Sequence, residues 1–276
     1  MAATMLFALH DATSKYLLPV FAVPLLVWAR YVTYVVIMAV GVAPSMGRAL
    51  IVSRRPRLMI FRAFLLVAVS IFFQNALQAL PLAEATALTF ITPLIVALLA
   101  GPMLGEKVRL RAWLATAAGF CGVLLIARPG GAMDPVGVAY ALAASLCYAF
   151  YQILTRKLSG SEPPMRQLFY TAIAGALAMS LVIPAYWTGI VPTPGQGLLI
   201  VSLGLTAGIG QFLLIRAFHI TTASTLSPLL YFQLVWAMLL GSLLFGQLPD
   251  LLTAAGMLVI GASCLSLVMQ QARAAA

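Results

Sequence analysis

The sequence contains few charged residues. Asp, Glu, Lys and Arg together make up 8% of its 276 residues, and only 6 of these side chains are acidic. A water-soluble domain is about 25% charged, so this chain has too little polar surface to cover a soluble globule. Because 63% of its residues are hydrophobic, we expect the lipid bilayer to be the solvent for most of it.

Residues that carry out catalysis or bind metals are also scarce. The two histidines, His10 and His219, are too few for a histidine-rich metal site, and the sequence has no HExxH, GxSxG or paired-aspartate pattern. Cys121, Cys147 and Cys264 each lie in an apolar stretch without a CxxC pair, which is typical of packing residues. No phosphate-binding P-loop occurs. We therefore expect no catalytic residue, metal, cofactor or direct use of ATP.

Ten apolar segments are long enough to cross a bilayer as helices. Proline, glycine and charged residues separate them, and the least polar of these breaks lies at residues 80–83. The N-terminal segment has no basic n-region or cleavage motif, so we interpret it as a retained helix. The predicted fold is an all-α membrane protein with helices at residues 2–18, 24–43, 58–79, 83–103, 110–127, 136–157, 166–187, 196–217, 223–245 and 251–270.

The net charge of +10 comes largely from Lys and Arg in every second connection. The positive-inside rule places such connections in the cytoplasm, which predicts a bacterial inner-membrane protein with both termini cytoplasmic. No basic face remains for nucleic acid. The residues counted for this side, with the adjoining helix ends, are Arg48, Arg54, Arg55, Arg57, Arg62, Lys107, Arg109, Arg111, Arg156, Lys157, Arg166 and Arg216.

The two halves of the sequence, residues 1–128 and 129–276, resemble each other weakly. Each half holds five predicted helices, an odd number, so the second half would enter the membrane from the opposite side. Inverted repeats of this kind place a substrate site near the midplane between the halves; chance similarity of apolar segments is the alternative. The matching features are Leu104-Gly105-Glu106 with Phe245-Gly246-Gln247, residues 79–86 with 217–224, and Lys15 with Lys157.

Short motifs also follow one another in a recognisable order. They are residues 79–93 ending in Leu104-Gly105-Glu106, residues 28–31, residues 128–130, residues 151–156 and residues 245–250. In order and spacing they resemble the drug/metabolite transporter superfamily, in particular its ten-helix EamA-type members. The resemblance implies that the first, third, fourth, sixth, eighth and ninth helices surround a central cavity. Gln247 stands where the first half has Glu106, so the role of that acid is not symmetric.

Polar side chains inside the apolar segments are the candidate substrate-binding residues, because a polar group at membrane depth must face protein or a wet cavity. Hydrogen bonding between helices is the alternative for the amides, packing for the aromatic rings, and an internal pair with Lys15 for Asp11. The candidates are His10, Asp11, Gln74, Asn75, Gln78, Tyr148, Tyr151, Gln152, Gln211, Tyr231, Gln233 and Trp236.

Four further residues are candidates for gating or structural roles. Arg30 either binds a substrate carboxylate or is tied to a helix-end carbonyl or to Glu84, and we favour the structural role. Glu106 is expected to cap a helix or form a gate salt bridge. Pro93 and Pro228 occupy corresponding places in the two halves, where a kink serves either as a hinge or as a static fit.

These features predict a secondary transporter working by alternating access. Its partners would be the bilayer and a small-molecule substrate, with the chain acting as a monomer. The family resemblance favours export of amino acids, including aromatic and apolar ones, with riboflavin or S-adenosylmethionine transport as the alternative. A membrane receptor or assembly subunit without transport and an intramembrane enzyme are the competing classes. The first lacks a soluble domain or long loop for a partner, and the second lacks catalytic motifs.

Overall fold

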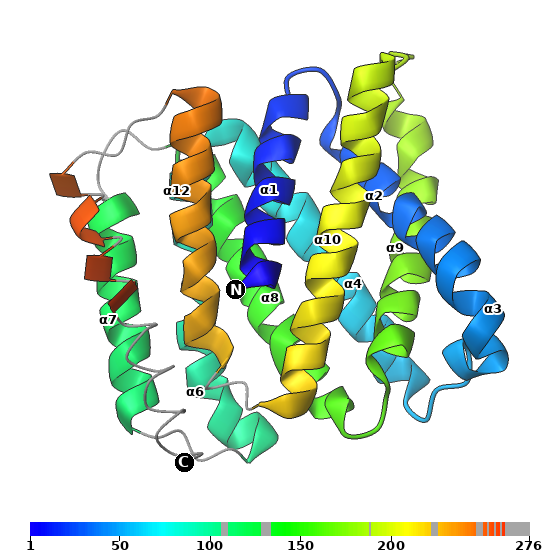
Figure 1. The fold of residues 1–276 in the computed structure, drawn as a ribbon, viewed down its shortest axis with the longest axis horizontal. Helices are drawn as coiled ribbons and strands as arrows, with labels where there is room; N and C mark the ends of the chain where they lie inside the picture. Colours follow the sequence, from blue (N-terminus) through cyan, green and yellow to red (C-terminus); the bar gives the residue numbers. More distant parts are fainter. Residues whose placement is uncertain are drawn as a thin grey trace.

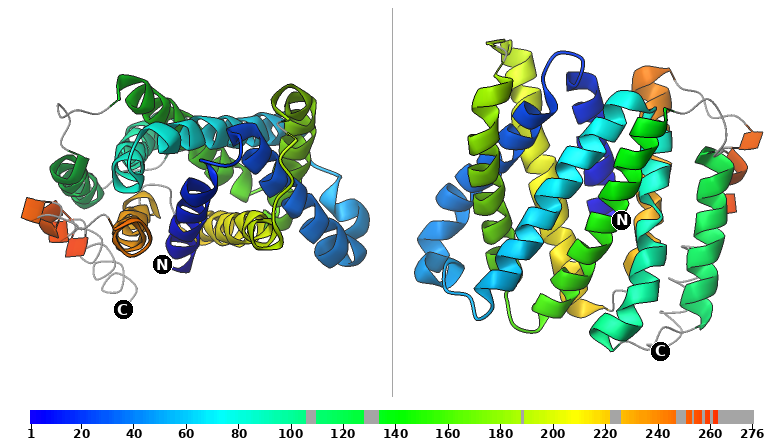
Figure 2. Two further views of the ribbon diagram at one scale, coloured as in Figure 1. Left: turned by 90° about the horizontal axis from the view of Figure 1, so that it is seen from above. Right: turned by 180° about the vertical axis from the view of Figure 1, so that it is seen from behind.

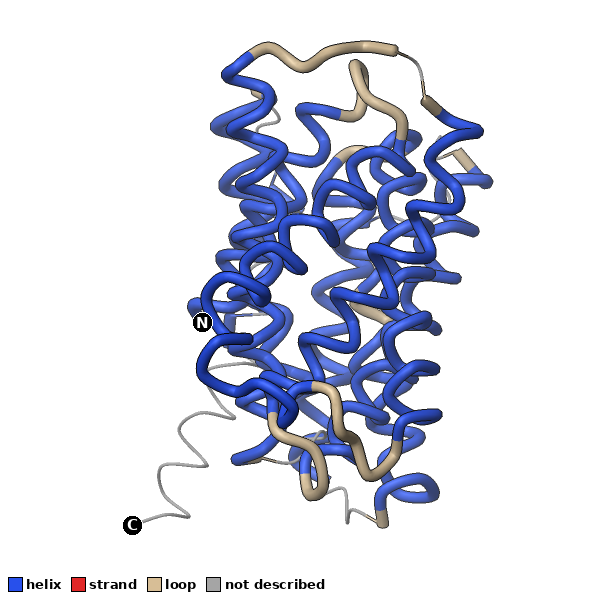
Figure 3. Tube along the Cα trace, turned by 90° about the vertical axis from the view of Figure 1, so that its right-hand side faces the viewer, coloured by secondary structure: helices blue, strands red, loops and turns tan. Residues whose placement is uncertain are grey.

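The computed structural model describes residues 1–105, 110–127, 134–187, 189–221, 226–246, 251–252, 254–256, 258–259 and 261–262. These residues form helices joined by short loops, and no strand occurs among them (Figure 3). The principal helices are α1 (Ala2–Leu17), α2 (Val23–Ile37), α4 (Pro56–Ala79), α5 (Leu82–Thr89), α6 (Thr92–Leu104), α7 (Leu110–Ala127), α8 (Pro135–Ser159), α9 (Pro164–Tyr186), α10 (Pro194–Ile220) and α12 (Phe232–Phe245).

Prolines start four of the long helices, at Pro56, Pro135, Pro164 and Pro194. The first helical position suits proline because its missing N–H would have no intrahelical partner there. Thr193 adds a capping box ahead of α10, since its side chain accepts from the Gln196 N–H while the Gln196 side chain accepts from its own backbone N–H. Local sequence signals therefore explain where these helices begin.

The five predicted helices between residues 2 and 127 and the four between residues 136 and 245 overlap described helices. Five described helices are long and apolar enough to cross a membrane by length and composition: α4, α8, α9, α10 and the stretch Val23–Gly41. The last predicted helix, at residues 251–270, falls mostly outside the described residues. The model thus supports an all-helical membrane protein, and the crossing of all ten segments stays a prediction.

Two of the predicted helices are interrupted near a proline. The segment at 83–103 is divided at Phe90–Ile91 into α5 and α6, and the backbone of Pro93 lies in the first turn of α6. The described part of the segment at 223–245 contains a 3-10 turn, η3 (Ser227–Tyr231), before α12. A proline removes a backbone donor, and its ring clashes with the carbonyl four residues earlier in a helix, which accounts for both interruptions. Whether they act as hinges stays a prediction.

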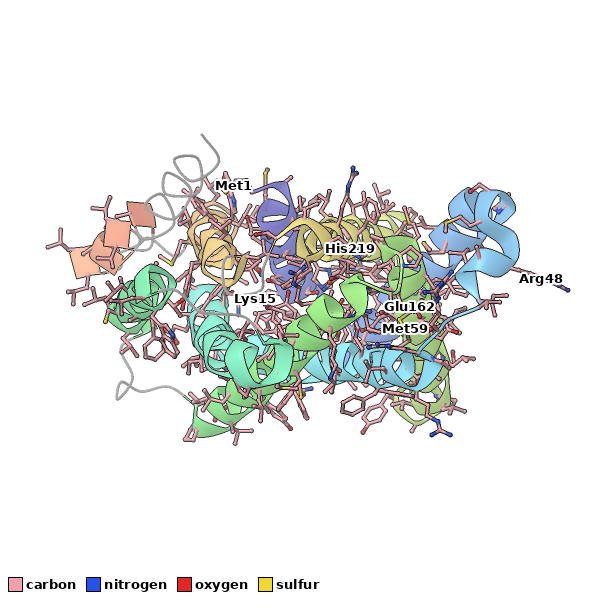
Figure 4. All side chains as sticks on the ribbon, turned by 90° about the horizontal axis from the view of Figure 1, so that it is seen from below. Met1, Lys15, Arg48, Met59, Glu162 and His219 are labelled. Carbon is pink, nitrogen blue, oxygen red and sulfur yellow. The ribbon has the colours of Figure 1, made fainter. Side chains whose placement is uncertain are left out.

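A third irregular segment follows α2. The helix passes through a π-helical turn, η1 (Met38–Val42), into the short α3 (Ala43–Met46) and a 3-10 turn, η2 (Gly47–Leu50). This segment projects from one side of the bundle (Figure 1). Arg48 extends away from the bundle at its end, as the view in Figure 4 shows.

Helices from the two ends of the chain are interleaved. Helix α1 packs against α10 and α12, α4 packs along α8 and α9, and α2 packs against α9 and α10. Seen from above, α12, α1 and α10 lie side by side along one face of the bundle, with α4 and α8 along the other (Figure 2). The hydrophobic core is built from both ends of the sequence, and a cavity lined by apolar and polar side chains lies within it.

Candidate functional site

A cavity of about 90 Å³ lies between α1, α2, α4, α5, α8, α10 and α12. It sits near the middle of the long helices, since α4 contributes residues 66–74 and α10 contributes residues 207–211. Phe7, Phe73 and Phe90 form part of its apolar wall. Eight of the residues selected from the sequence line it: His10, Asp11, Arg30, Gln74, Tyr148, Gln152, Gln211 and Gln233.

Arg30 supplies the positive charge of this cavity. Its side chain is buried, with a relative exposure of 7%. One terminal nitrogen donates to Ser70 Oγ, and the guanidinium carbon lies 4.6 Å from the centre of the Tyr31 ring. Its Nε has no hydrogen-bond partner. Neither Glu84 nor a helix-end carbonyl contacts Arg30 among the described residues, so the tie that the sequence suggested is wrong.

His10 links Arg30 to the opposite wall. Its Nδ1 lies 3.2 Å from the backbone oxygen of Leu203, and its Nε2 lies 3.5 Å from Arg30 Nη1. A carbonyl oxygen can only accept and a guanidinium can only donate. This geometry assigns a neutral imidazole that donates through Nδ1 to α10 and presents Nε2 as an acceptor to Arg30.

Asp11 supplies the negative charge. Its Oδ2 accepts a hydrogen bond of 2.8 Å from Gln233 Nε2 on α12. The alternative to a cavity role, a pair between Asp11 and Lys15, does not form, because Lys15 Nζ instead donates to the backbone oxygens of Leu77 and Leu80, at 3.1 and 2.7 Å. A lysine at the end of α4 satisfies carbonyls that have no partner within the helix, and this leaves Asp11 to the cavity.

Two glutamine amides in the lining have no hydrogen-bond partner. Both polar atoms of Gln74, on α4, and both polar atoms of Gln152, on α8, are buried and unpaired. The relative exposures of these residues are 2% and 0%. A buried amide without a partner costs free energy of about 1–3 kcal/mol, and nearly all such groups in folded proteins find one. A polar ligand in the cavity would satisfy them.

Five of the predicted site residues lie outside the lining. Asn75 bonds back to the Ile71 carbonyl within α4, and Gln78 is exposed on the outside of the same helix. Tyr231 donates to the Phe90 carbonyl, while Trp236 is half-buried with its Nε1 unpaired. Tyr151, the fifth, is buried next to the cavity and donates to Gln211 at 3.1 Å.

Tyr151 connects the cavity to an arginine whose placement the sequence did not reveal. Arg62 was expected at a basic helix end, but it is fully buried on α4. It donates to Tyr151 Oη at 2.6 Å, Thr155 Oγ1 at 2.7 Å and Thr171 Oγ1 at 3.0 Å. No acidic side chain pairs with it among the described residues. Arg62 therefore ties α4 to α8 and α9 beside the cavity rather than marking a loop.

Spacing along α4 contains a signal for this arrangement. Arg62, Leu66, Ser70 and Gln74 follow one another every four residues and therefore lie along one face of the helix. Leu66, Ser70 and Gln74 line the cavity. The polar members of this row identify the inward face of α4, and they include Ser70 and Arg62, which the candidate list omitted.

The connections on the basic side are held together by Glu162, in the loop between α8 and α9. Its Oε1 accepts from Ser53 Oγ at 2.6 Å and from the backbone N–H groups of Arg54 and Arg55, while its Oε2 pairs with Arg166 at 2.6 Å. Burial alone would raise the pKa of the Glu162 carboxyl, but these hydrogen bonds lower that pKa below its ordinary value. Figure 4 looks onto this end of the bundle.

The remaining candidates are only partly described. Glu106 lies outside the described residues, so its expected capping or gate role stays untested. For Pro93 and Pro228 the backbone is placed at the two helix interruptions. No group of three or more His, Cys, Asp or Glu residues that could hold a metal ion occurs in the part of the chain that the structure describes.

Comparison with known proteins places these features in a family. The model of the EamA-like transporter family matches residues 1–128 and 135–269. An S-adenosylmethionine uptake transporter from Rickettsia prowazekii is 28% identical over 214 residues, covering 78% of this chain and 72% of that protein. A riboflavin transporter from Rhizobium johnstonii is 31% identical over 194 residues, covering 68% of this chain and 60% of that protein.

A crystal structure with 19% sequence identity shares the fold. It has a TM-score of 0.77 and covers 99% of this chain and 97% of the other. The resemblance to EamA-type members of the drug/metabolite transporter superfamily, drawn from the sequence motifs, is confirmed by the family match and by these relatives.

Proposed function

Because this chain belongs to the EamA-like transporter family, we propose that it is a secondary transporter that exports small metabolites across the bacterial inner membrane by alternating access. Amino acids, including aromatic and apolar ones, are the first substrate candidates. The observation that carries the proposal is the central cavity, which combines a buried cation, a buried carboxylate, unpaired amides and aromatic walls. Mostly apolar sites with a few convergent polar groups are typical of small-molecule binding.

The size of the cavity supports a carrier that must change shape. Its volume of about 90 Å³ is smaller than the roughly 300–1,000 Å³ of ordinary sites for small organic ligands. A metabolite with several polar groups therefore needs the surrounding helices to separate before it enters. Alternating access includes such a separation, first toward one side of the membrane and then toward the other.

Contacts between the helices support the two proposed five-helix units, residues 1–128 and 129–276. In an inverted repeat, α1, α2 and α4 correspond to α8, α9 and α10. The contact of α1 with α10 then matches that of α8 with α4, and the contact of α2 with α10 matches that of α9 with α4. This pairing is what a two-fold relation between the units requires.

A pair of helix-end contacts points the same way. Lys15, near the end of α1, donates to the Leu77 and Leu80 carbonyls at the end of α4. Arg156, near the end of α8, donates to the Phe218 carbonyl at the end of α10 at 2.7 Å. The same bond in both units supports the repeat, with Arg156 rather than its neighbour Lys157 as the counterpart of Lys15.

Uptake of S-adenosylmethionine or riboflavin is the second candidate function. It is favoured by the relatives from Rickettsia prowazekii and Rhizobium johnstonii, whose names give these substrates, and the first of which is described as an uptake transporter. Both candidates use the same fold and the same cavity, so the solute and the direction of net flux distinguish them.

Counterflow in proteoliposomes tests the proposal. Vesicles preloaded with unlabelled amino acids, S-adenosylmethionine or riboflavin are exposed to the radiolabelled compound, and its uptake is measured against protein-free vesicles. We expect saturable, preload-dependent uptake of at least one amino acid. Uptake of S-adenosylmethionine or riboflavin alone would replace the amino-acid assignment with the second candidate. An absence of saturable flux for every compound would refute the transporter assignment itself.

A further inference from the structure

We propose that the cavity selects a zwitterion, with Arg30 binding the substrate's carboxylate and Asp11, held by Gln233, binding its ammonium group. This inference rests on the proposed transport function and narrows its substrate class to compounds that contain an α-amino-acid group. Its basis is the way in which the cavity divides its two charges.

Asp11 and Arg30 line the same cavity without forming an ion pair. Both residues are buried, with relative exposures of 5% and 7%, yet no nitrogen–oxygen contact within 4.0 Å joins their side chains in the part of the chain that the structure describes. Opposite charges attract strongly where water is excluded, so direct pairing would be the ordinary outcome. Here each charge is held instead by neutral partners on its own wall.

Those partners keep the charges on separate walls. Arg30, on α2, is held by Ser70 of α4 and by the acceptor nitrogen of His10. Asp11, on α1, is held by Gln233 of α12. Helix α1 presents the neighbouring residues His10 and Asp11 in different directions, the first toward α10 and α2 and the second toward α12. A ligand that enters the cavity therefore meets a cation on one wall and an anion on another.

Charge balance then limits what can occupy the cavity. The described ionisable side chains that line it are Asp11, Arg30, the neutral His10 and the neutral phenol of Tyr148, so its formal charge is zero. A ligand with a single charge would pair with one wall and leave the opposite charge with only its neutral hydrogen-bond partners, without an ionic partner. A zwitterion satisfies both walls at once, and an uncharged ligand satisfies neither.

The unpaired amides add a second requirement. Gln74 and Gln152 each offer a free donor and a free acceptor, on α4 and α8. These groups suit a substrate that has hydrogen-bonding atoms besides its amino-acid group, while Phe7, Phe73 and Phe90 provide apolar contact. An amino acid with a large, partly polar side chain meets these conditions. S-adenosylmethionine offers the same amino-acid group but adds a sulfonium charge, which must find its partners among the amides and aromatic rings. Riboflavin, which lacks an amino-acid group, does not use the divided charge.

A set of related compounds tests the proposal on the unmodified protein. Binding is measured by competition with a transported radiolabelled solute for L-methionine, S-adenosylmethionine, L-methionine methyl ester, 4-(methylthio)butanoate and riboflavin. The ester lacks the carboxylate and the butanoate lacks the ammonium. Since a charge-assisted hydrogen bond contributes about 1.5–3 kcal/mol, each single-charge compound should bind about 10- to 100-fold more weakly than L-methionine.

Two substitutions then assign the charges to their residues. In Asp11→Asn the positive wall remains, so 4-(methylthio)butanoate should bind more tightly than L-methionine. In Arg30→Gln the negative wall remains, so the order should reverse in favour of the methyl ester. Gln78→Ala, on the exposed face of α4, is the control and should keep the ranking of the unmodified protein. A residue with only a structural role would weaken every ligand without exchanging their order.

The outcomes separate this inference from the transporter assignment. Saturable transport of riboflavin with no competition by either zwitterion would overturn the zwitterion inference and leave transport in place. Equal binding of L-methionine and its methyl ester by the unmodified protein would also overturn it, whether or not the variants fold. If no solute shows saturable flux, both the transporter assignment and the inference fail.

Discussion

Removing the charge of Glu162 is the most direct test of how the loops on the basic side of the bundle are held together. This side chain joins the loop before α4 to the loop between α8 and α9, and it accepts four hydrogen bonds in doing so. Glu162→Gln keeps the volume and shape of the side chain. Its amide, however, has a single acceptor atom and two donor hydrogens, so it cannot reproduce the contacts.

The structure sets the size of the expected effect. If the amide oxygen faces Ser53 and the two backbone N–H groups, the amide nitrogen must face the Arg166 guanidinium, and a charge-assisted bond worth about 1.5–3 kcal/mol is lost. The three remaining bonds become neutral and weaker. Glu162 has a relative exposure of 1%, so solvent screens little of this. Burying the neutral amide costs less free energy than burying the carboxylate, which offsets part of this loss. The net fall in the free energy of unfolding is therefore about 2–4 kcal/mol.

Thermal unfolding of the purified protein in detergent measures this loss. For a protein of this size, it corresponds to a fall in melting temperature of about 5–10 °C. Asp134→Asn is the matched control, because Asp134 is an exposed acid that caps α8 through the Val136 N–H and Asn caps a helix equally well. Its melting temperature should stay within about 1 °C of the unmodified value.

The pH dependence provides a second measurement. Because its hydrogen bonds lower the pKa of Glu162, its stabilising effect is present at neutral pH and above the ordinary pKa of a glutamate. It is lost as the pH falls through the lower pKa of the folded state. The Gln variant has no such loss, so the two melting temperatures should converge in acid. A gap that stays constant from about pH 7 to about pH 3, or no gap at neutral pH, would refute the reasoning.

Three further substitutions test the packing around the cavity. Arg62→Met leaves no acidic partner unpaired, so the unfolding free energy in a denaturant titration should change by less than about 2 kcal/mol. Its rate of counterflow should change, because the proposed rocking of the two units would move α4 against α8. Gly175→Ala should lower the unfolding free energy by about 1–3 kcal/mol, since the new Cβ would lie 2.5 Å from the buried Tyr31 ring. Gly197→Ala is its control, because a Cβ at Gly197 would meet open space. Lys15→Met should lower stability by about 1–2 kcal/mol, measured in the same titration, because two carbonyls at the end of α4 lose their donor.

Each of these substitutions has an outcome that contradicts the structure. A loss of more than about 4 kcal/mol in Arg62→Met would mean that an unpaired charge remains behind, against the hydrogen bonds found here. Equal stability of Gly175→Ala and Gly197→Ala would mean that α9 does not approach Tyr31 closely. An unchanged Lys15→Met protein would remove the helix-end contact on which part of the repeat argument rests.

The helices themselves could be predicted from the sequence because their signals are local. Long apolar runs, prolines at Pro56, Pro135, Pro164 and Pro194, and polar breaks determine where each helix begins and ends. The positions of eight cavity residues were predictable for a related reason, since a polar side chain inside an apolar helix has few places to go. The arrangement of six helices around a central cavity was predicted from the family resemblance and not from these local signals.

Contacts between helices could not be predicted in the same way. Arg62 was counted with the basic loops because it lies only a few residues inside α4, and its burial depends on Tyr151, Thr155 and Thr171, which are about 90 or more positions away. The role of Glu162 could not be predicted, because a single acidic residue in a loop is common and no motif surrounds it. Asp11 and Lys15 have the spacing of a helical pair, yet partners on other helices compete successfully for both.

The contact between the two helix interruptions has a mechanical consequence. Phe90, at the division of α5 from α6, lies 5.0 Å from Tyr231 between ring centres, and the Tyr231 hydroxyl donates to the Phe90 carbonyl at 3.1 Å. If both interruptions bend during transport, as predicted, bending at one would press on the other, and the two would share one pivot. A carrier built in this way would resist opening at both ends at once, and it would thereby keep the membrane free of a continuous leak.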